Sequence, residues 1–221
     1  YDIRFIYRHP AAWYINVLPR RDVIEYPIVD LLDYSGWDIQ KALFLLNKSN
    51  PVLFEWLQSP IIYAQSPGFV QSMSAVTPLY FSPIGTIYHY LHMAENNFRE
   101  YLRSSLVKVK KYFYVLRPLL ACYWIEKFAT APPMEFDKLR AAVLTDPNLN
   151  SVLDGLLARK RSGVELGLEP QIPEINEFVE TSIARFRDAV TSYDPRQKPD
   201  PEILNTLLVS LVMPFGGGNS A

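Results

Sequence analysis

The chain has 221 residues, of which 49% are hydrophobic and 20% are charged, and its formal net charge is −1. This composition provides enough apolar side chain for a packed core, which excludes disorder over most of the length. The near-zero charge excludes a basic field over the whole surface, so any binding of nucleic acid must come from a local patch.

No segment has the features of a secretion signal or a membrane span. Charges interrupt the opening residues, and Arg117 and Pro118 interrupt the most apolar stretch, Tyr112–Ile125. The one cysteine, Cys122, cannot form an internal disulfide, so we expect a soluble protein of a reducing compartment, the cytoplasm, without a membrane partner. A catalytic thiol is the alternative for Cys122, and a small buried side chain is the simpler interpretation. The chain begins with Tyr1 rather than Met, and we expect that upstream residues are missing.

The opening part of the chain has the patterns of a small sheet. Polar and apolar residues alternate over Asp2–Tyr7, which predicts a half-buried strand. A loop with Pro10 and Pro19 follows, and Val23–Ile28 is the next strand candidate, at a sheet edge because it contains a proline. Leu31–Trp37 is a third strand candidate. Together the three segments predict a small mixed sheet.

Helical patterning dominates after Trp37. Asp38 is a good N-cap for Ile39–Lys48, whose apolar residues recur at helical spacing. Asn50 and Pro51 break this helix and start a short one. Further helices are predicted over Ser66–Tyr80, Pro83–Arg103, Val107–Phe128, Pro147–Ser162, Pro173–Tyr193 and Pro201–Val212.

The change from a period of two residues to helical spacing predicts an α+β fold. In this fold a small mixed sheet precedes a larger helical domain, with at least six helices after residue 38. We place the two domains at residues 1–60 and 61–212, and we expect a flexible tail over 213–221. Pro132 and Pro133 mark a linker inside the helical domain.

Two carboxylates lie on the predicted strands, Asp2 on the first and Asp33 on the third. Neighbouring strands lie about 4.8 Å apart, so carboxylates on one face of a sheet can share a metal ion. A metal ion in such a site neutralises a triphosphate and activates an attacking hydroxyl. Solvated carboxylates at strand ends are the alternative, which spacing alone favours.

A second candidate site combines basic and aromatic residues. Lys110, Tyr114 and Arg117 fall on one face of the predicted helix, with Lys111 next to it. Such a stripe can hold triphosphate oxygens and stack a base. A solvated helix face with extended lysine stems is the alternative. The whole group comprises Lys108, Lys110, Lys111, Tyr112, Tyr114 and Arg117.

Four other residues have weaker chemical signals. Lys41 opens the helix after the third strand, where it can reach a phosphate group, and a surface lysine is the alternative. Asn50 is either a turn residue or part of a nucleotide site. His89 and His92 have the spacing of two metal ligands on one helix face. No third ligand accompanies them, which favours packed or half-exposed histidines over a zinc site.

Several sequence blocks occur in an order that resembles a known family. They are similar to predicted nucleotidyltransferases of the DNA polymerase β superfamily, and closest to the RNA repair pathway DNA polymerase β family, over roughly residues 1–190. The resemblance implies that residues 1–60 are the C-terminal part of a nucleotidyltransferase palm and that 61–212 form a helical substrate-binding domain. The blocks are YDIRFIY, RDVIEYP, LLDYSGWDIQKAL, KSNP, EWLQSP, FREYL, KKYFYVLRPLLACYWIE, PPMEF and LLARKRSG.

The superfamily fold has a Gly-Ser turn, an Asp-x-Asp pair on one strand and a third acidic residue on a neighbouring strand. The resemblance implies that Asp2 is the second aspartate of the pair and Asp33 the third acidic residue, both as catalytic metal ligands. Asp30 and Asp38 are rivals for the third position, and Asp38 is disfavoured because helix capping already explains it. The Gly-Ser turn and the first aspartate are absent from this sequence, so the residues present form only part of a two-metal site.

The resemblance implies an enzyme that transfers a nucleoside monophosphate from an NTP to a hydroxyl acceptor, with an RNA end as one candidate. Mg²⁺ or Mn²⁺ is the implied cofactor. The alternative is a non-catalytic nucleotide- or RNA-binding relative with an incomplete active site. The residues expected to bind the nucleotide are Lys41, Asn50, Lys110, Lys111, Tyr114 and Arg117.

Overall fold

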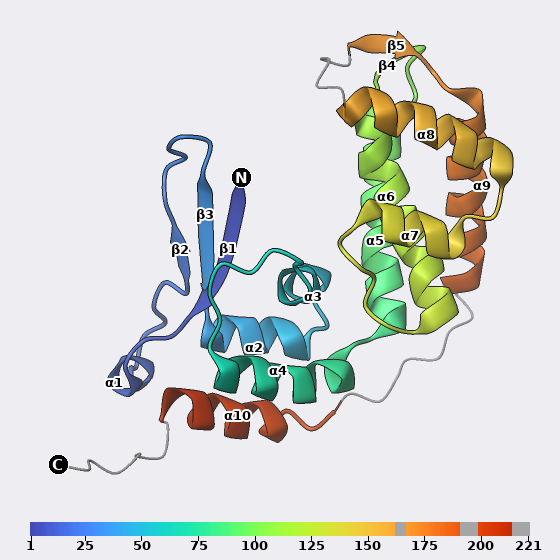
Figure 1. Ribbon diagram of the computed structural model, residues 1–221. Helices are drawn as coiled ribbons and strands as arrows, with labels where there is room; N and C mark the ends of the chain where they lie inside the picture. The colour runs from blue at the N-terminus through green and yellow to red at the C-terminus, as the bar shows by residue number, and fades with distance from the viewer. Residues whose placement is uncertain (162–166, 191–198, 214–221) are drawn as a thin grey trace. The chain divides into compact units, whose positions relative to one another are not determined.

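The computed structural model describes residues 1–161, 167–190 and 199–213 of the chain (Figure 1). These residues form ten helices, a three-stranded sheet and a two-stranded sheet, which confirms the predicted α+β class. They divide into two compact units. The first unit comprises Tyr1–Phe81 with the C-terminal helix α10 (Glu202–Val212), and the second begins at Ser82.

The sheet of the first unit is mixed, as predicted, with the strand order β1–β3–β2. β1 (Asp2–Tyr7) runs parallel to β3 (Asp33–Asp38), and β2 (Val23–Glu25) runs antiparallel to β3 (Figure 1). Between β1 and β2 lies α1 (Ala11–Tyr14), where we expected only a loop. A helix of four residues is too short to show helical periodicity in the sequence.

β2 and β3 are shorter than the predicted strands because of the turn between them. Asp30 and Leu31 have φ angles of 50° and 65°, and Val29 forms a bridge with Leu32 across the turn. Positive φ at two successive residues is typical of the tight turns that join antiparallel strands. β3 therefore begins at Asp33, two residues later than expected.

α2 (Ile39–Asn47) starts directly after β3 because Asp38 caps it. The Asp38 side chain is buried, and its Oδ1 accepts a 2.8 Å hydrogen bond from the backbone N–H of Gln40. Its Oδ2 accepts a 2.7 Å bond from the Tyr14 hydroxyl. The expected capping role of Asp38 is confirmed.

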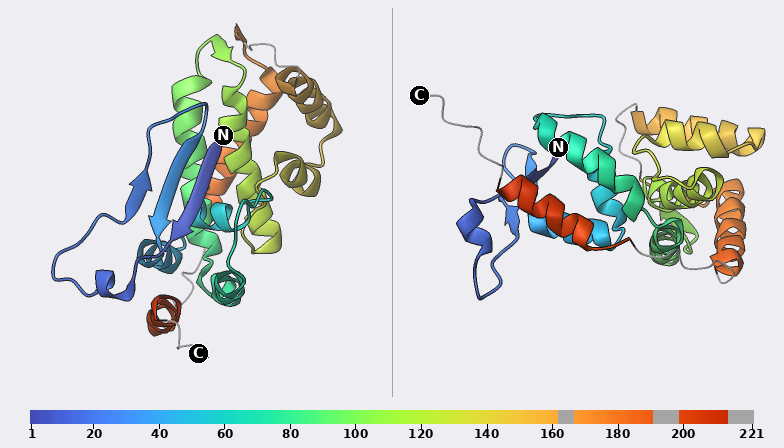
Figure 2. Two further views of the ribbon diagram at one scale, coloured as in Figure 1. Left: turned by 60° about the vertical axis from the view of Figure 1, so that its left-hand side comes forward. Right: turned by 90° about the horizontal axis from the view of Figure 1, so that it is seen from below.

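α2 is the centre of the first unit. α3 (Pro51–Leu57), α4 (Pro67–Tyr80) and α10 all contact it, and Figure 2 shows α10 beside α2. Asn50 caps α3 through a 3.0 Å bond from the backbone N–H of Val52. The buried apolar side chains of this core include Ile39, Leu43, Leu46, Leu53 and Phe54.

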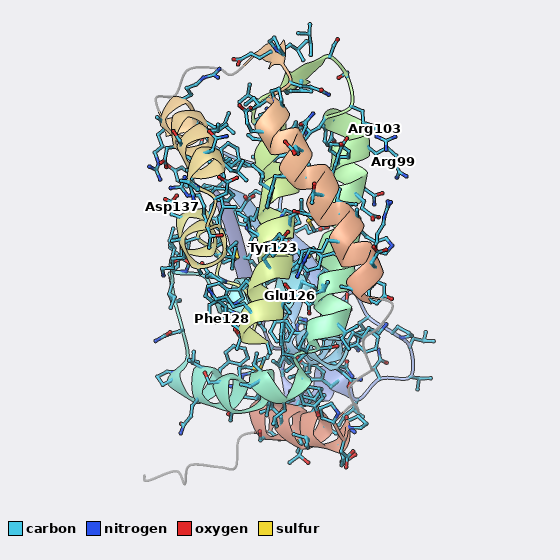
Figure 3. All side chains as sticks on the ribbon, turned by 90° about the vertical axis from the view of Figure 1, so that its right-hand side faces the viewer. Arg99, Arg103, Tyr123, Glu126, Phe128 and Asp137 are labelled. Atoms are coloured by element: carbon cyan, nitrogen blue, oxygen red, sulfur yellow. The ribbon has the colours of Figure 1, made fainter. Side chains whose placement is uncertain are left out.

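The second unit is built on two long neighbouring helices, α5 (Pro83–Tyr101) and α6 (Lys111–Phe128). α9 (Pro173–Val190) packs on both of them. Tyr123 and Glu126 lie on the side of α6 that contacts α9 (Figure 3). Most of α6 is buried between its neighbours, so this helix supplies much of the core of the second unit.

Two elements of the second unit differ from the expectation. A short strand, β4 (Leu106–Lys108), pairs with β5 (Leu168–Pro170), so α6 begins at Lys111 and not at Val107. The two strands are distant in the sequence, and local periodicity carries no information about such pairing. α7 (Phe136–Val143) follows the proline linker, where no helix was expected.

The other predicted helices are confirmed within the described residues, and nine helices follow residue 38 there. α8 (Pro147–Arg161) and α9 begin at the predicted prolines. Their expected ends at Ser162 and Tyr193 lie outside the described residues, as does the tail from residue 214. The first unit extends past residue 60, where we placed the domain boundary, because α4 packs on α2. Among the described helices, none has the length and apolar character needed to cross a membrane.

Replacing Asp38 by alanine should destabilise the first unit by about 1–3 kcal/mol, because the cap of α2 and the acceptor of the Tyr14 hydroxyl are both lost. Urea unfolding measures the change in the free energy of unfolding. Ser66→Ala is the matched control, since Ser66 is the N-cap residue of α4 without a side-chain cap bond. Its effect should stay within about 0.5 kcal/mol. Equal losses in the two variants would contradict the capping role.

Candidate functional site

One face of the sheet in the first unit gathers charged side chains. The parallel pairing puts Asp2 opposite Asp33 and Arg4 opposite Ser35. Side chains two residues apart in a strand share a face, so Asp2 and Arg4 project from the same side of β1, as Asp33 and Ser35 do from β3. The sheet therefore brings Asp2 and Asp33, hereafter the carboxylate pair, together as neighbours.

The Arg4 guanidinium lies between the two members of the carboxylate pair. Its Nη2 donates a 2.8 Å hydrogen bond to Oδ2 of Asp33 and a 3.1 Å bond to Oδ1 of Asp2. Its Nη1 donates a 2.8 Å bond to the backbone carbonyl of Asp33. The two carboxylates thus converge on one point, which a cationic side chain occupies. Arg4 was not among the predicted site residues, although the alternation of β1 puts it on the same face as Asp2.

The electrostatics of the carboxylate pair follow from this arrangement. The hydrogen bond from Arg4 holds the pKa of Asp33 below its usual value; partial burial opposes this lowering, and the positive charge of Arg4 adds to it. The side chains of Asp2 and Asp33 are 78% and 36% exposed. Asp33 is therefore ionised at neutral pH, and both carboxylates are accessible to ions and ligands from solution.

The carboxylate pair fits part of a divalent metal site. Mg²⁺ commonly binds one or two protein carboxylates, together with waters and substrate phosphates, at about 2.1 Å. The Arg4 nitrogen, in contact with both carboxylates, marks the point where a cation is stabilised. Over the described ranges, no group of three or more His, Cys, Asp or Glu side chains is arranged to hold a metal. The pair can therefore supply two ligands of a site that other oxygen atoms must complete.

The rivals of Asp33 are placed less favourably. Asp38 stands at the other end of β3, about 16 Å from Asp33 for a six-residue strand. Its carboxylate is buried and already accepts two hydrogen bonds. Asp30 is exposed in the turn before β3, with a positive φ. Of the three aspartates, Asp33 is the one that shares the Arg4 guanidinium with Asp2.

Lys41 and Asn50 have structural partners in the first unit. Lys41 Nζ forms a 3.1 Å ion pair with Asp22 at the wall of a cavity of about 470 Å³. The Asp22 carbonyl accepts a hydrogen bond from the N–H of Asp38, which puts this ion pair at the opposite end of β3 from Asp33. The Asn50 side chain caps α3. The structure thus gives Lys41 an ion-pair partner and Asn50 a capping role.

In the second unit, some of the expected basic and aromatic residues form a compact cluster. Lys111 Nζ lies 3.7 Å from the ring centroid of Tyr101 and 4.5 Å from that of Tyr114, and both are cation–π contacts. Tyr114 is 50% exposed. Lys110 is exposed and immediately precedes α6. We call Tyr101, Lys111 and Tyr114 the Tyr–Lys–Tyr cluster. Tyr101 was not predicted as a member, because only packing brings the end of α5 next to α6.

Two other members of the expected group have different surroundings. Arg117 is half-buried, and its Nη2 lies 3.4 Å from Sδ of Met134 in the proline linker. Tyr112 is fully buried, and its hydroxyl accepts a 2.7 Å bond from the backbone N–H of Ile172, so it belongs to the core. The carboxylate pair lies in the first unit and these residues in the second. It stays a prediction that these basic residues and the carboxylate pair line one cleft.

Cys122 and the two histidines are held by their neighbours. The buried Cys122 thiol lies 3.7 Å from the carbonyl of Ile87, and burial raises the pKa of this thiol. His92 Nδ1 lies 2.9 Å from the carbonyl of Tyr88, and the His89 ring packs edge-on against a tyrosine ring. These contacts favour a structural interpretation over a catalytic thiol or a zinc site.

A family model and a relative both match most of the chain. The model of the RNA repair pathway DNA polymerase beta family matches residues 1–210, which confirms the resemblance of the sequence blocks. "Uncharacterized protein YcgL" of Bacillus subtilis (strain 168) is 45% identical over 212 residues, which are 96% of this chain and 82% of the relative. No solved structure gives a significant match.

The Cys122 thiol of the folded protein should react very slowly with Ellman's reagent, because burial excludes the reagent and the raised pKa keeps the thiol protonated. Absorbance of the released thiolate measures the reaction. After unfolding in urea the same thiol should react fully, which serves as the positive control. Rapid labelling of the folded protein would contradict the buried position and favour the catalytic thiol.

Proposed function

The chain belongs to the RNA repair pathway DNA polymerase beta family, and from this premise we propose that it transfers a nucleoside monophosphate from an NTP to a hydroxyl acceptor. The observation that carries the proposal is the convergence of the Asp2 and Asp33 carboxylates on one cationic point. Two accessible carboxylates in register on neighbouring strands provide the anionic oxygens that metal-dependent phosphoryl chemistry uses.

The proposed reaction joins the acceptor oxygen to the α-phosphorus of the NTP. The bond between this phosphorus and the bridging oxygen breaks, pyrophosphate leaves, and the hydroxyl proton passes to solvent. A bound Mg²⁺ or Mn²⁺ supplies charge neutralisation on the triphosphate. Asp2 and Asp33 are the residues proposed to hold the ion, and the lowered pKa of Asp33 keeps that ligand ionised at neutral pH.

The Tyr–Lys–Tyr cluster is the part of the second unit proposed to bind the nucleotide. The Lys111 ammonium can bind phosphate oxygens, and the exposed ring of Tyr114 offers a face for stacking a base. Lys110 adds an exposed charge next to the half-buried Lys111. Arg117, Lys41 and Asn50 remain proposed nucleotide contacts, each with a protein partner that the nucleotide would have to replace or share.

An RNA end is the acceptor class that we propose. The family description, which names an RNA repair pathway, supports this choice. A labelled-NTP transfer screen with the complete protein, Mg²⁺ or Mn²⁺, and RNA, protein and small-molecule acceptors tests it directly. Transfer to a protein or small molecule and not to RNA would reject the RNA acceptor and keep the reaction type.

A non-catalytic nucleotide- or RNA-binding role is the second candidate function. The observation that favours it is that no group of three or more His, Cys, Asp or Glu side chains among the described residues is arranged to hold a metal ion. Nucleotide binding without transfer to any acceptor in the same screen would support this role over the enzyme.

Asp33→Asn in the complete protein should lower metal-dependent transfer by about 100-fold or more, because an amide is a poor ligand for Mg²⁺ and removes a charge from the site. The fold should be retained, since the Asp33 side chain is partly exposed at the start of a strand. Asp30→Asn is the matched control, on the exposed turn three residues earlier, and should keep full activity. Full activity of Asp33→Asn would remove Asp33 from the site.

Lys111→Ala should weaken nucleotide binding by about tenfold, because a charge-assisted contact to phosphate is lost. Isothermal titration with a non-hydrolysable NTP analogue measures the change. Lys127→Ala is the control, since Lys127 lies near the other end of α6 and also contacts an aromatic ring, that of Phe128 at 5.3 Å. Equal affinity in the Lys111 variant and the unaltered protein would exclude the Tyr–Lys–Tyr cluster from the nucleotide site.

A further inference from the structure

Arg4 has more partners than an ordinary surface ion pair. Its guanidinium donates to both members of the carboxylate pair, and also to the backbone carbonyls of Asp33 and Ile3, at 2.8 and 3.3 Å. The Arg4 side chain is 27% exposed, less than either carboxylate. The arginine is therefore fixed against the sheet, while the carboxylates remain open to solvent.

The two negative charges of Asp2 and Asp33 explain why a cation is stabilised between β1 and β3. Asp2 and Asp33 are in register on adjacent strands, and two unpaired carboxylates at this spacing repel each other. Arginine stays protonated in proteins, so its guanidinium offsets this repulsion at any physiological pH. A partly exposed ion pair adds little to the free energy of unfolding. The main consequence of Arg4 is thus its occupation of the space between the carboxylates.

The guanidinium holds one oxygen of each carboxylate, Oδ1 of Asp2 and Oδ2 of Asp33, so a divalent cation bound by the same two oxygens would have to displace it. Mg²⁺ binds carboxylate oxygens at about 2.1 Å, whereas Nη2 of Arg4 lies 2.8 and 3.1 Å from the two oxygens. Arg4 would have to release these two oxygens before the carboxylate pair could hold such an ion. A triphosphate offers the released guanidinium new anionic partners, which arginine binds in a bidentate manner.

We propose that Arg4 is the resident counter-ion of the carboxylate pair, that it competes with a divalent cation in the nucleotide-free protein, and that it moves to the phosphates when metal and nucleotide bind together. The proposal rests on the proposed function, because it gives Arg4 a role at the same site. Arg4 is then a positioning residue that couples metal binding to nucleotide binding. The affinity of the carboxylate pair for a divalent cation would then depend on a bound triphosphate, which gives Arg4 other anionic partners.

Titration with Mn²⁺, followed by electron paramagnetic resonance, tests this coupling in the unaltered protein and in Arg4→Gln. Without nucleotide, Arg4→Gln should bind Mn²⁺ on the order of tenfold more tightly, because the competitor is gone. With a non-hydrolysable NTP analogue present, Mn²⁺ affinity should rise strongly in the unaltered protein and by a smaller factor in Arg4→Gln. Unchanged Mn²⁺ affinity of Arg4→Gln without nucleotide would overturn the proposal.

Arg21→Gln is the matched control. Arg21 also pairs with a carboxylate, that of Glu25 at 3.2 Å, and its replacement changes the net charge equally. Its Mn²⁺ affinity should equal that of the unaltered protein, and a gain as large as that of Arg4→Gln would show a general charge effect and reject the competition. Arg4→Lys keeps the charge but loses the planar guanidinium. Its Mn²⁺ affinity should therefore lie between those of the unaltered protein and Arg4→Gln. It provides the comparison if Arg4→Gln does not fold.

The double variant Arg4→Gln with Asp33→Asn locates the metal. The gain in Mn²⁺ affinity that Arg4→Gln shows over the unaltered protein should disappear in the double variant. A retained gain would place the metal elsewhere and overturn the proposal. If Arg4→Gln shows the gain but no transfer activity is found for the complete protein, the proposed enzyme fails and the competition stands. If transfer depends on Asp33 and Mn²⁺ affinity does not depend on Arg4, the competition fails and the enzyme stands.

Discussion

The parallel register of β1 against β3 is the constraint on which the candidate site depends. It puts Asp2 opposite Asp33 and leaves Arg4 one step further along the same face. A slip of one residue would turn one strand over relative to the other and separate the carboxylates onto opposite faces of the sheet. Gly36 helps to hold the other face, because a Cβ atom there would lie 2.2 Å from the ring of Phe5. Strand packing on one face thus preserves the charged arrangement on the other.

The two aspartates at the ends of β3 show how surroundings decide the use of a carboxylate. Asp38 is buried, and its oxygens are taken by a helix N-terminus and a tyrosine hydroxyl, so it stabilises the passage from the sheet into α2. Asp33 is partly exposed and pairs with a guanidinium that it shares with Asp2. The same residue type is structural at one end of the strand and available for chemistry at the other.

In the second unit, α6 carries both buried core residues and residues of the proposed nucleotide site. Residues deeper in this helix, such as Leu116 and Cys122, are fully buried, and its first turn presents Lys111 and Tyr114 beside Tyr101. A helix fixed by burial on most sides can hold exposed charges in a defined position, which a mobile loop cannot do at the same cost in conformational entropy. The buried core of α6 therefore holds the Tyr–Lys–Tyr cluster, our proposed nucleotide contact, in a defined position.

The sequence by itself determined β1, the Asp38 and Asn50 caps and the positions of most helices. The reason is that alternation, helix capping and proline signals act within a few residues of the chain. Alternation also placed Asp2 on the right strand, and resemblance singled out Asp33. Tertiary structure alone decided that β4 pairs with β5, that Tyr101 meets Lys111, and that Arg4 fills the space between the carboxylates. Each of these contacts joins segments that are separate in the chain, and the packing of the whole unit selects them over the many alternatives that local pattern permits equally.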